Sequence, residues 1–156
     1  MMTKVSADPQ PDAMERAFAE AAAAAARGEV PVGAAVADAA GRVVAAAGNE
    51  VEARTDPTAH AEMLALRAAS DALGTPRLVD CDLYVTLEPC PMCATAASFA
   101  RVRRVVFAAY DPKGGGVEHG PRIYTHPTCH HRPEVIGGVQ GGRAEALLKE
   151  FFARRR

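Results

Sequence analysis

Residues 86–93 read Thr-Leu-Glu-Pro-Cys-Pro-Met-Cys, and this stretch decides how the rest of the chain can fold. An apolar run that is typical of a strand, residues 83–87, ends at Glu88-Pro89, and Pro91 suits the first position of a helix. Cys90 then caps the helix, and Cys93 lies in its first turn. Because the positive end of a helix lowers the pKa of a thiol, the pattern predicts two thiolates that can hold a metal ion.

A second stretch, Asp-Pro-Thr-Ala-His-Ala-Glu at residues 56–62, supplies the remaining groups. His60 is the predicted third ligand, and no fourth protein ligand stands at motif spacing. Three protein ligands are typical of a catalytic zinc ion, which keeps one position for water. Glu62 follows His60 by two residues, and residues at that separation do not share a helical face. We therefore expect Glu62 to point past the metal toward water or substrate and to carry protons.

The order of strand-like and helix-like segments predicts an α/β fold. The patterns predict four helices: one that Asp12 caps and Gly28 ends, one from Asp56-Pro57 to Gly74, one at 91–100 and a closing helix at 143–156. They also predict strands at 30–37 and 42–47, which form a hairpin, and further strands at 82–87, 103–110 and 134–139. Residues 1–11 contain two prolines and little apolar periodicity, which predicts a flexible N-terminal tail before one domain at 12–156.

The two stretches together resemble a known family. His60-Ala61-Glu62 and Pro89-Cys90-Pro91-Met92-Cys93 resemble the H-x-E and P-C-x-x-C signature of the zinc-dependent cytidine and deoxycytidylate deaminase superfamily. The segments at residues 29–33, 56–62 and 83–90 are similar to bacterial tRNA-specific adenosine deaminases, and the similarity extends from about Asp12 to the last residue. It implies a three-layer α/β/α fold with a five-stranded mixed sheet.

This resemblance also implies an activity. It is the hydrolytic deamination of adenosine to inosine at the wobble position of a tRNA anticodon, with one Zn²⁺ per chain held by His60, Cys90 and Cys93 and with Glu62 as the catalytic residue. The implied partners are a tRNA anticodon stem-loop and a second copy of the chain. In that homodimer, the helices after His60 and after Cys93 lie near the partner.

Substrate-binding residues follow from the resemblance as well. By residue type alone, Asn49 is a turn residue that tolerates a left-handed backbone, but the family's asparagine at this position contacts the target base. Val30 and Ala61 line the same pocket, whose apolar wall repays part of the cost of unstacking the base. Further along the chain, the resemblance places Asp111, Lys113 and the final helix, with Phe152, near the anticodon loop.

Two other functions fit the same residues. A deaminase of a free nucleobase or nucleoside, such as guanine or cytosine, shares the zinc ligands and would need a closed lid but no basic tail. A zinc-stabilised RNA-binding module without catalysis would leave Glu62 and the missing fourth ligand unexplained, and a chelator would unfold it.

Composition limits the remaining possibilities. The 156 residues suffice for one domain with a real core, and 49% hydrophobic and 24% charged residues are ordinary values for a globular protein. The net charge of −1 requires that any RNA contact come from a local patch, such as the basic end Arg154-Arg155-Arg156. Residues 1–11 do not resemble a secretory signal, the alanine run at 21–26 is too short to cross a membrane, and cysteines in metal spacing fit a reducing compartment. We expect a cytoplasmic protein without a membrane span.

Residues 111–133 form a long segment that predicts irregular structure, with three consecutive glycines at 114–116. Loops of this length in compact domains are typically functional or disordered. His126, Cys129, His130 and His131 lie within it, but they lack the spacing of a metal motif, so we do not predict a second metal site there.

Overall fold

The computed structural model describes residues 8–155. Its helices and strands, in chain order, are α1 (Pro11–Ala26), β1 (Gly33–Ala37), β2 (Val43–Gly48), α2 (Val51–Arg54), α3 (Ala61–Leu73), β3 (Asp82–Leu87), α4 (Pro91–Phe99), β4 (Arg104–Ala109), the 3₁₀ turn η1 (Ile123–Thr125), β5 (Glu134–Ile136) and α5 (Gly141–Ala153). Of the tail expected at residues 1–11, residues 1–7 lie outside this description, and Pro11 is already helical.

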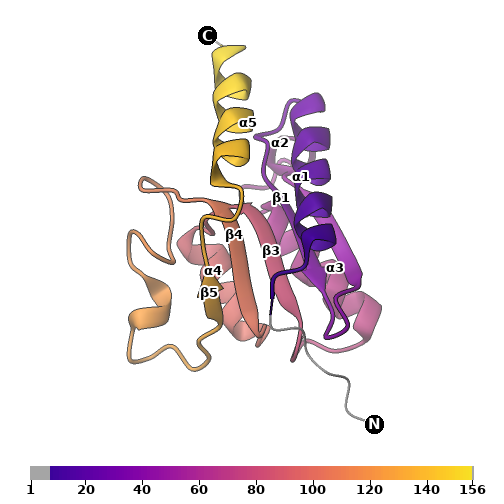
Figure 1. Ribbon diagram of the computed structural model, residues 1–156, viewed down its shortest axis with the longest axis vertical. Coiled ribbons are helices and arrows are strands. Elements are labelled where there is room, and N and C mark those ends of the chain that lie inside the picture. The colour runs from indigo at the N-terminus through magenta and orange to yellow at the C-terminus, as the bar shows by residue number, and fades with distance from the viewer. Residues whose placement is uncertain (1–7, 156) are drawn as a thin grey trace.

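The strands form one mixed sheet in the order β2-β1-β3-β4-β5. Strand β1 is antiparallel to β2 and β3, whereas β3, β4 and β5 run parallel to one another. Helices α1 and α5 cover one face of the sheet, and α3 and α4 cover the other (Figure 1). The predicted three-layer α/β fold with a five-stranded mixed sheet is therefore confirmed.

Side-chain alternation along the central strands explains why both faces are covered. In β3, Leu83 and Val85 join the core beneath α3 and α4, while Tyr84 joins the core beneath α1 and α5. Strand β4 follows the same rule, with Val105 on one face and Val106 on the other. Successive residues of a strand point to opposite faces, so a strand that is apolar throughout must be buried on both sides.

Two predicted helix starts are wrong. Helix α1 begins at Pro11 with Gln10 as its N-cap, and Asp12, the predicted cap, lies in the first turn of the helix. Helix α3 begins at Ala61 and not at Pro57, because the Asp56 carboxylate accepts hydrogen bonds from the backbone and hydroxyl of Thr58 and so forms a local turn. The last strand is shorter than predicted, and the closing helix covers 141–153 instead of 143–156.

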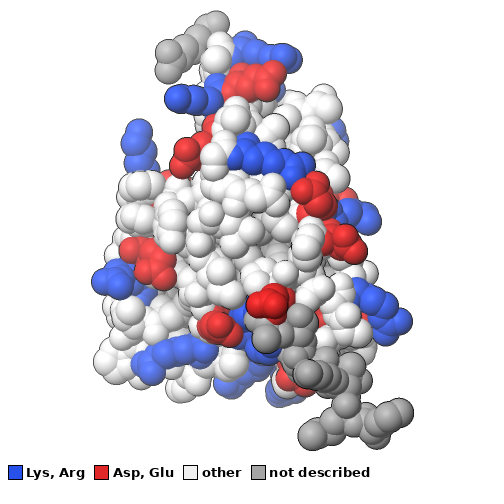
Figure 2. All heavy atoms as spheres, viewed as in Figure 1, with Lys and Arg blue, Asp and Glu red and all other residues white. Residues whose placement is uncertain are grey.

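None of the helices between residues 8 and 155 is long and apolar enough to cross a membrane. Basic and acidic side chains alternate over the face shown in Figure 2, and some of each surround the end of α5.

Candidate active site

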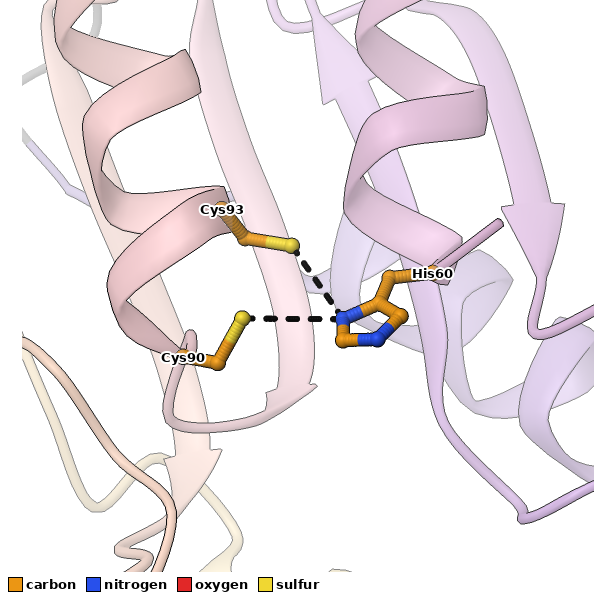
Figure 3. A group of neighbouring side chains, drawn as sticks. All are labelled: His60, Cys90 and Cys93. Atoms are coloured by element: carbon orange, nitrogen blue, oxygen red, sulfur yellow. Dashed lines mark hydrogen bonds between the residues drawn. The ribbon is translucent and has the colours of Figure 1, made fainter. Parts of the chain in front are cut away.

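Two neighbouring helix N-termini bring the predicted metal ligands together. His60 is the N-cap of α3, Cys90 is the N-cap of α4, and Cys93 lies in the first turn of α4. Both sulfurs point at the Nδ1 atom of His60, at 3.6 Å from Cys90 and 3.5 Å from Cys93 (Figure 3). The three ligand atoms all lie within 4.8 Å of one another.

This geometry fits zinc. A tetrahedral ion with Zn–S distances of about 2.3 Å and a Zn–N distance of about 2.0 Å sets its sulfur and nitrogen ligands about 3.5 Å apart. The observed nitrogen–sulfur distances of 3.5 and 3.6 Å match that separation. Two thiolates and one imidazole are also a donor set that zinc prefers.

The two thiols differ in acidity, which corrects the prediction that both have a lowered pKa. Hydrogen bonds from Cys93 and His60 lower the pKa of Cys90 to about 4. The same contact with Cys90, together with burial, raises the pKa of Cys93. In return, the contact with Cys90 and the nearby negative charges raise the pKa of His60. Cys90 is therefore the more acidic of the two thiols before a metal ion binds, and a bound zinc ion would deprotonate both.

Glu62 lies buried in the first turn of α3, only 4% exposed. Burial, with a further contribution from the charge of Cys90, raises the pKa of Glu62 to about 7. A carboxyl group with a pKa near neutrality can both take up and release a proton at physiological pH.

A pocket of about 260 Å³ opens beside the metal ligands. Its lining includes, beside His60, Glu62 and Cys90, four of the predicted substrate-binding residues: Val30, Asn49, Ala61 and Asp111. Lys113 is exposed two positions beyond Asp111 and is outside the lining. Phe152 lies on α5, 50% exposed, beside a separate surface groove. The structure thus brings together all but two of the predicted site residues.

Asn49 is held in place by the start of α2. Its backbone N–H donates to Val32, and its side-chain Oδ1 accepts a hydrogen bond from the backbone N–H of Val51 at 3.2 Å. Because the side-chain oxygen is engaged in this way, the amide NH₂ group is the part that can donate to a molecule in the pocket.

Two buried glutamates hold the walls of the pocket, and neither was predicted as a site residue. Glu29 is 2% exposed, and its carboxylate accepts hydrogen bonds from the backbone N–H groups of Glu52 and Ala53, just beyond Asn49. Glu88 is equally buried and binds the loop that follows β4. Both occur in motif segments, where a charged residue among apolar ones was the only available signal.

The histidines and cysteine of the long loop do not form a second metal site. His126 and His131 bond instead to the backbone carbonyls of Pro121 and Val102, and Cys129 donates to the carbonyl of His131. Among residues 8–155, His60, Cys90 and Cys93 form the one group with metal-binding spacing.

The α/β/α fold and the zinc-type triad at two helix N-termini together define a zinc-binding deaminase region. The chain belongs to the cytidine and deoxycytidylate deaminase family, whose zinc-binding region matches residues 8–109. It is 51% identical over 144 residues to the tRNA-specific adenosine deaminase of Agrobacterium fabrum, a match that covers 92% of this chain and 93% of that protein.

Solved structures give the same grouping. A structure from studies of A-to-I editing by tRNA:A34 deaminases superposes with a TM-score of 0.87 and 50% identity, covering 89% of this chain and all of the other. A guanine deaminase from Nitrosomonas europaea superposes with a TM-score of 0.80 and 28% identity, covering 96% of this chain and 87% of the other.

Proposed function

We propose that this protein hydrolytically deaminates adenosine to inosine at the wobble position of a tRNA anticodon. One observation carries the proposal: a buried glutamate and a three-ligand zinc-type site share a pocket with an asparagine amide. The tRNA-specific relatives, which match this chain over nearly their whole length, support adenosine in RNA as the substrate. We assign the activity to one domain, residues 12–156.

His60, Cys90 and Cys93 would hold the zinc ion, which supplies Lewis acidity that makes water a nucleophile at neutral pH. Glu62 would act as the general acid and base. It would accept a proton from the attacking water and pass it to the adenine ring nitrogen. It would then accept the proton of the hydroxyl newly added to the ring and deliver it to the departing amine, which leaves as ammonia. Its place in the pocket lining, two residues from His60, supports this role.

The pocket walls would select the base. Asn49 would hydrogen-bond to the adenine through its amide, and Val30 and Ala61 would cover its apolar faces. Removing a base from its stack costs a few kcal/mol, which burial against such walls partly repays. Asp111 and Lys113, on the loop after β4, would contact the neighbouring nucleotides.

The exposed side of α5 would bind the rest of the anticodon loop. Phe152 is half exposed there, and an exposed aromatic ring can stack on an unpaired base. Arg154 and Arg155 follow after Ala153 and can pair with phosphates.

We also infer a cytoplasmic homodimer. At the end of α4, Phe99 is 74% exposed beside an apolar groove of about 560 Å³ between α4 and the 121–130 loop. A large exposed aromatic side chain next to a groove is typical of a protein interface. Sedimentation of the purified protein tests this inference, and a monomer at micromolar concentration would contradict it.

The substrate panel decides the function. The zinc-loaded protein is incubated with an anticodon stem-loop that carries a wobble adenosine and, separately, with free adenosine, guanine and cytosine. We expect inosine and ammonia from the stem-loop alone. Ammonia from guanine, with an unchanged stem-loop, would favour the free-base alternative that the Nitrosomonas structure represents. Phe152→Ala should weaken stem-loop binding, whereas it should not affect deamination of a free base.

A further inference from the structure

The carboxylate of Glu88 is surrounded by donors from one loop. Glu88 follows β3, and its side chain is fully buried. Its two oxygens accept hydrogen bonds from four backbone N–H groups and one imidazole: Asp111 at 3.0 Å, Val117 at 3.2 Å, Glu118 at 2.9 Å, His119 at 3.1 Å and the His119 ring Nδ1 at 2.8 Å. One side chain thus fixes both ends of the 111–119 segment, which we call the pocket loop.

The glycines of the pocket loop explain how it comes so close. A Cβ at Gly115 would collide with the Glu88 carboxylate, and a Cβ at Gly116 would meet the backbone of Cys90 and Pro91. In addition, the Gly116 N–H donates to the Pro89 carbonyl at 2.7 Å. The loop therefore rests directly on the turn that carries the metal ligand Cys90.

A carboxylate suits this position better than any other side chain. Oε1 accepts from Asp111 and the His119 ring, and Oε2 accepts from three successive backbone N–H groups. Both oxygens must be acceptors, whereas a glutamine would turn an NH₂ group toward donors on one side. Hydrogen bonds to a charged acceptor are also stronger than neutral ones, so losing several of them would strongly destabilise the position of the pocket loop.

We infer that Glu88 is a positioning residue. Through its hydrogen bonds to the pocket loop, it determines the positions from which Asp111 and Lys113 contact the RNA, and it takes no part in the chemical step. Asp111 both donates its backbone N–H to Glu88 and lines the pocket, so this single residue connects the Glu88 carboxylate to the pocket. This inference deepens the proposed function and rests on it for the identity of the substrate.

The kinetic test uses Glu88→Gln, with Glu118→Gln as the matched control. Glu118 lies in the same loop, its side chain is exposed, and its substitution removes the same charge. We expect Glu88→Gln to keep its zinc and to raise KM for the stem-loop about tenfold while kcat changes less than about threefold, because a displaced loop weakens binding. Glu118→Gln should match the wild type.

A second test follows the loop itself and needs no substrate. The chain has three lysines, at positions 4, 113 and 149, so a lysine-specific protease has a single site in the pocket loop. We expect Glu88→Gln to be cut after Lys113 at least about tenfold faster than the wild type, since local opening controls cleavage. Gly115→Ala, which pushes the loop away while keeping the carboxylate, should give the same cut and tests the inference if Glu88→Gln does not fold.

The outcomes separate this inference from the proposed function. Wild-type KM and wild-type cleavage in the variants would overturn the positioning role. Loss of zinc, or equal falls in kcat and kcat/KM, would overturn it too, by placing Glu88 in the metal turn or in the chemistry. If the wild type leaves the stem-loop unchanged, the proposed function fails, while the cleavage rates still decide whether Glu88 holds the loop.

Discussion

Cys81 and Cys90 carry the same thiol in opposite environments. Burial, with help from the nearby charges of Asp38 and Asp82, raises the pKa of Cys81 to about 11. Donors from Cys93 and His60 instead lower the pKa of Cys90 to about 4. An apolar environment disfavours the charged thiolate, whereas hydrogen bonds to the sulfur favour it. The spacing of the cysteines indicated which of them bind metal, and burial explains why the Cys81 thiol resists ionisation.

Thiol alkylation tests this difference. At about pH 8, iodoacetamide should leave Cys81 of the folded, zinc-loaded protein unmodified, whereas Cys81 of the protein unfolded in urea should react, because only the thiolate reacts. In the folded protein, Cys81 should become reactive only at a pH above the one at which an ordinary thiol ionises, since its pKa is raised. Peptide mass spectrometry measures Cys81 in both samples. Equal modification of Cys81 in the folded and unfolded protein at about pH 8 would contradict the prediction.

Glu62→Gln tests proton transfer. The substitution keeps the size of the side chain and removes its ability to accept a proton, so turnover should fall by about 10² to 10⁴-fold. Zinc content should stay at the wild-type value because Glu62 is not one of the three ligands. Glu20→Gln, on the surface of α1, serves as the control. Retained activity, or loss of zinc, would show that Glu62 has a different role.

Among the elements, β3, α4 and β4 lie within a residue or so of their predicted bounds. Their apolar runs are continuous, and proline or charged residues interrupt them at both ends. The start of α3 was not predictable in the same way, because Asp56 can either cap a helix or close a turn, and only its bonds to Thr58 decide. The four-residue helix α2 is too short to show periodicity at all.

Gly33→Ala tests how closely α1 packs on the sheet. A Cβ at Gly33 would collide with the backbone of α1 at Ala17 and Ala21, and a helix backbone cannot move away locally. We expect a loss of about 1–3 kcal/mol in the free energy of unfolding, typical of overpacking. Gly142→Ala is the matched control: its Cβ meets nothing within 4 Å, so it should be neutral or slightly stabilising. Urea denaturation of the two variants against the wild type measures both effects.

At the scale of the whole molecule, the metal site lies on a fold that has its own support. Separate hydrophobic clusters fill both faces of the sheet, and helices α3 and α4 pack in one of these clusters. Cys93 lies in α4, and His60 and Cys90 directly precede α3 and α4. The sequence predicted the ligands because their spacing is local. It did not predict Glu29 and Glu88, because their burial depends on chain segments more than twenty residues away. Lys113 and Phe152 remain predictions until RNA contacts are measured.

Removal of zinc should therefore inactivate the protein without unfolding it. Dialysis against a chelator is expected to abolish deamination, to lower the melting temperature by several degrees or less, and to leave the far-ultraviolet circular dichroism unchanged. Added zinc should restore activity. Collapse of the helical signal on chelation would instead favour the zinc-stabilised RNA-binding module, which would fold only with its metal.

Glu29 and Glu88 hold the pocket walls almost entirely through main-chain amides. Nineteen of the twenty amino acids offer such an amide, and proline alone does not. The exposed side chains at positions 52, 53 and 118 can therefore diversify in evolution, or be randomised in a library for altered substrate preference, while the loops keep their course. Proline at these positions is the change that such a library should omit.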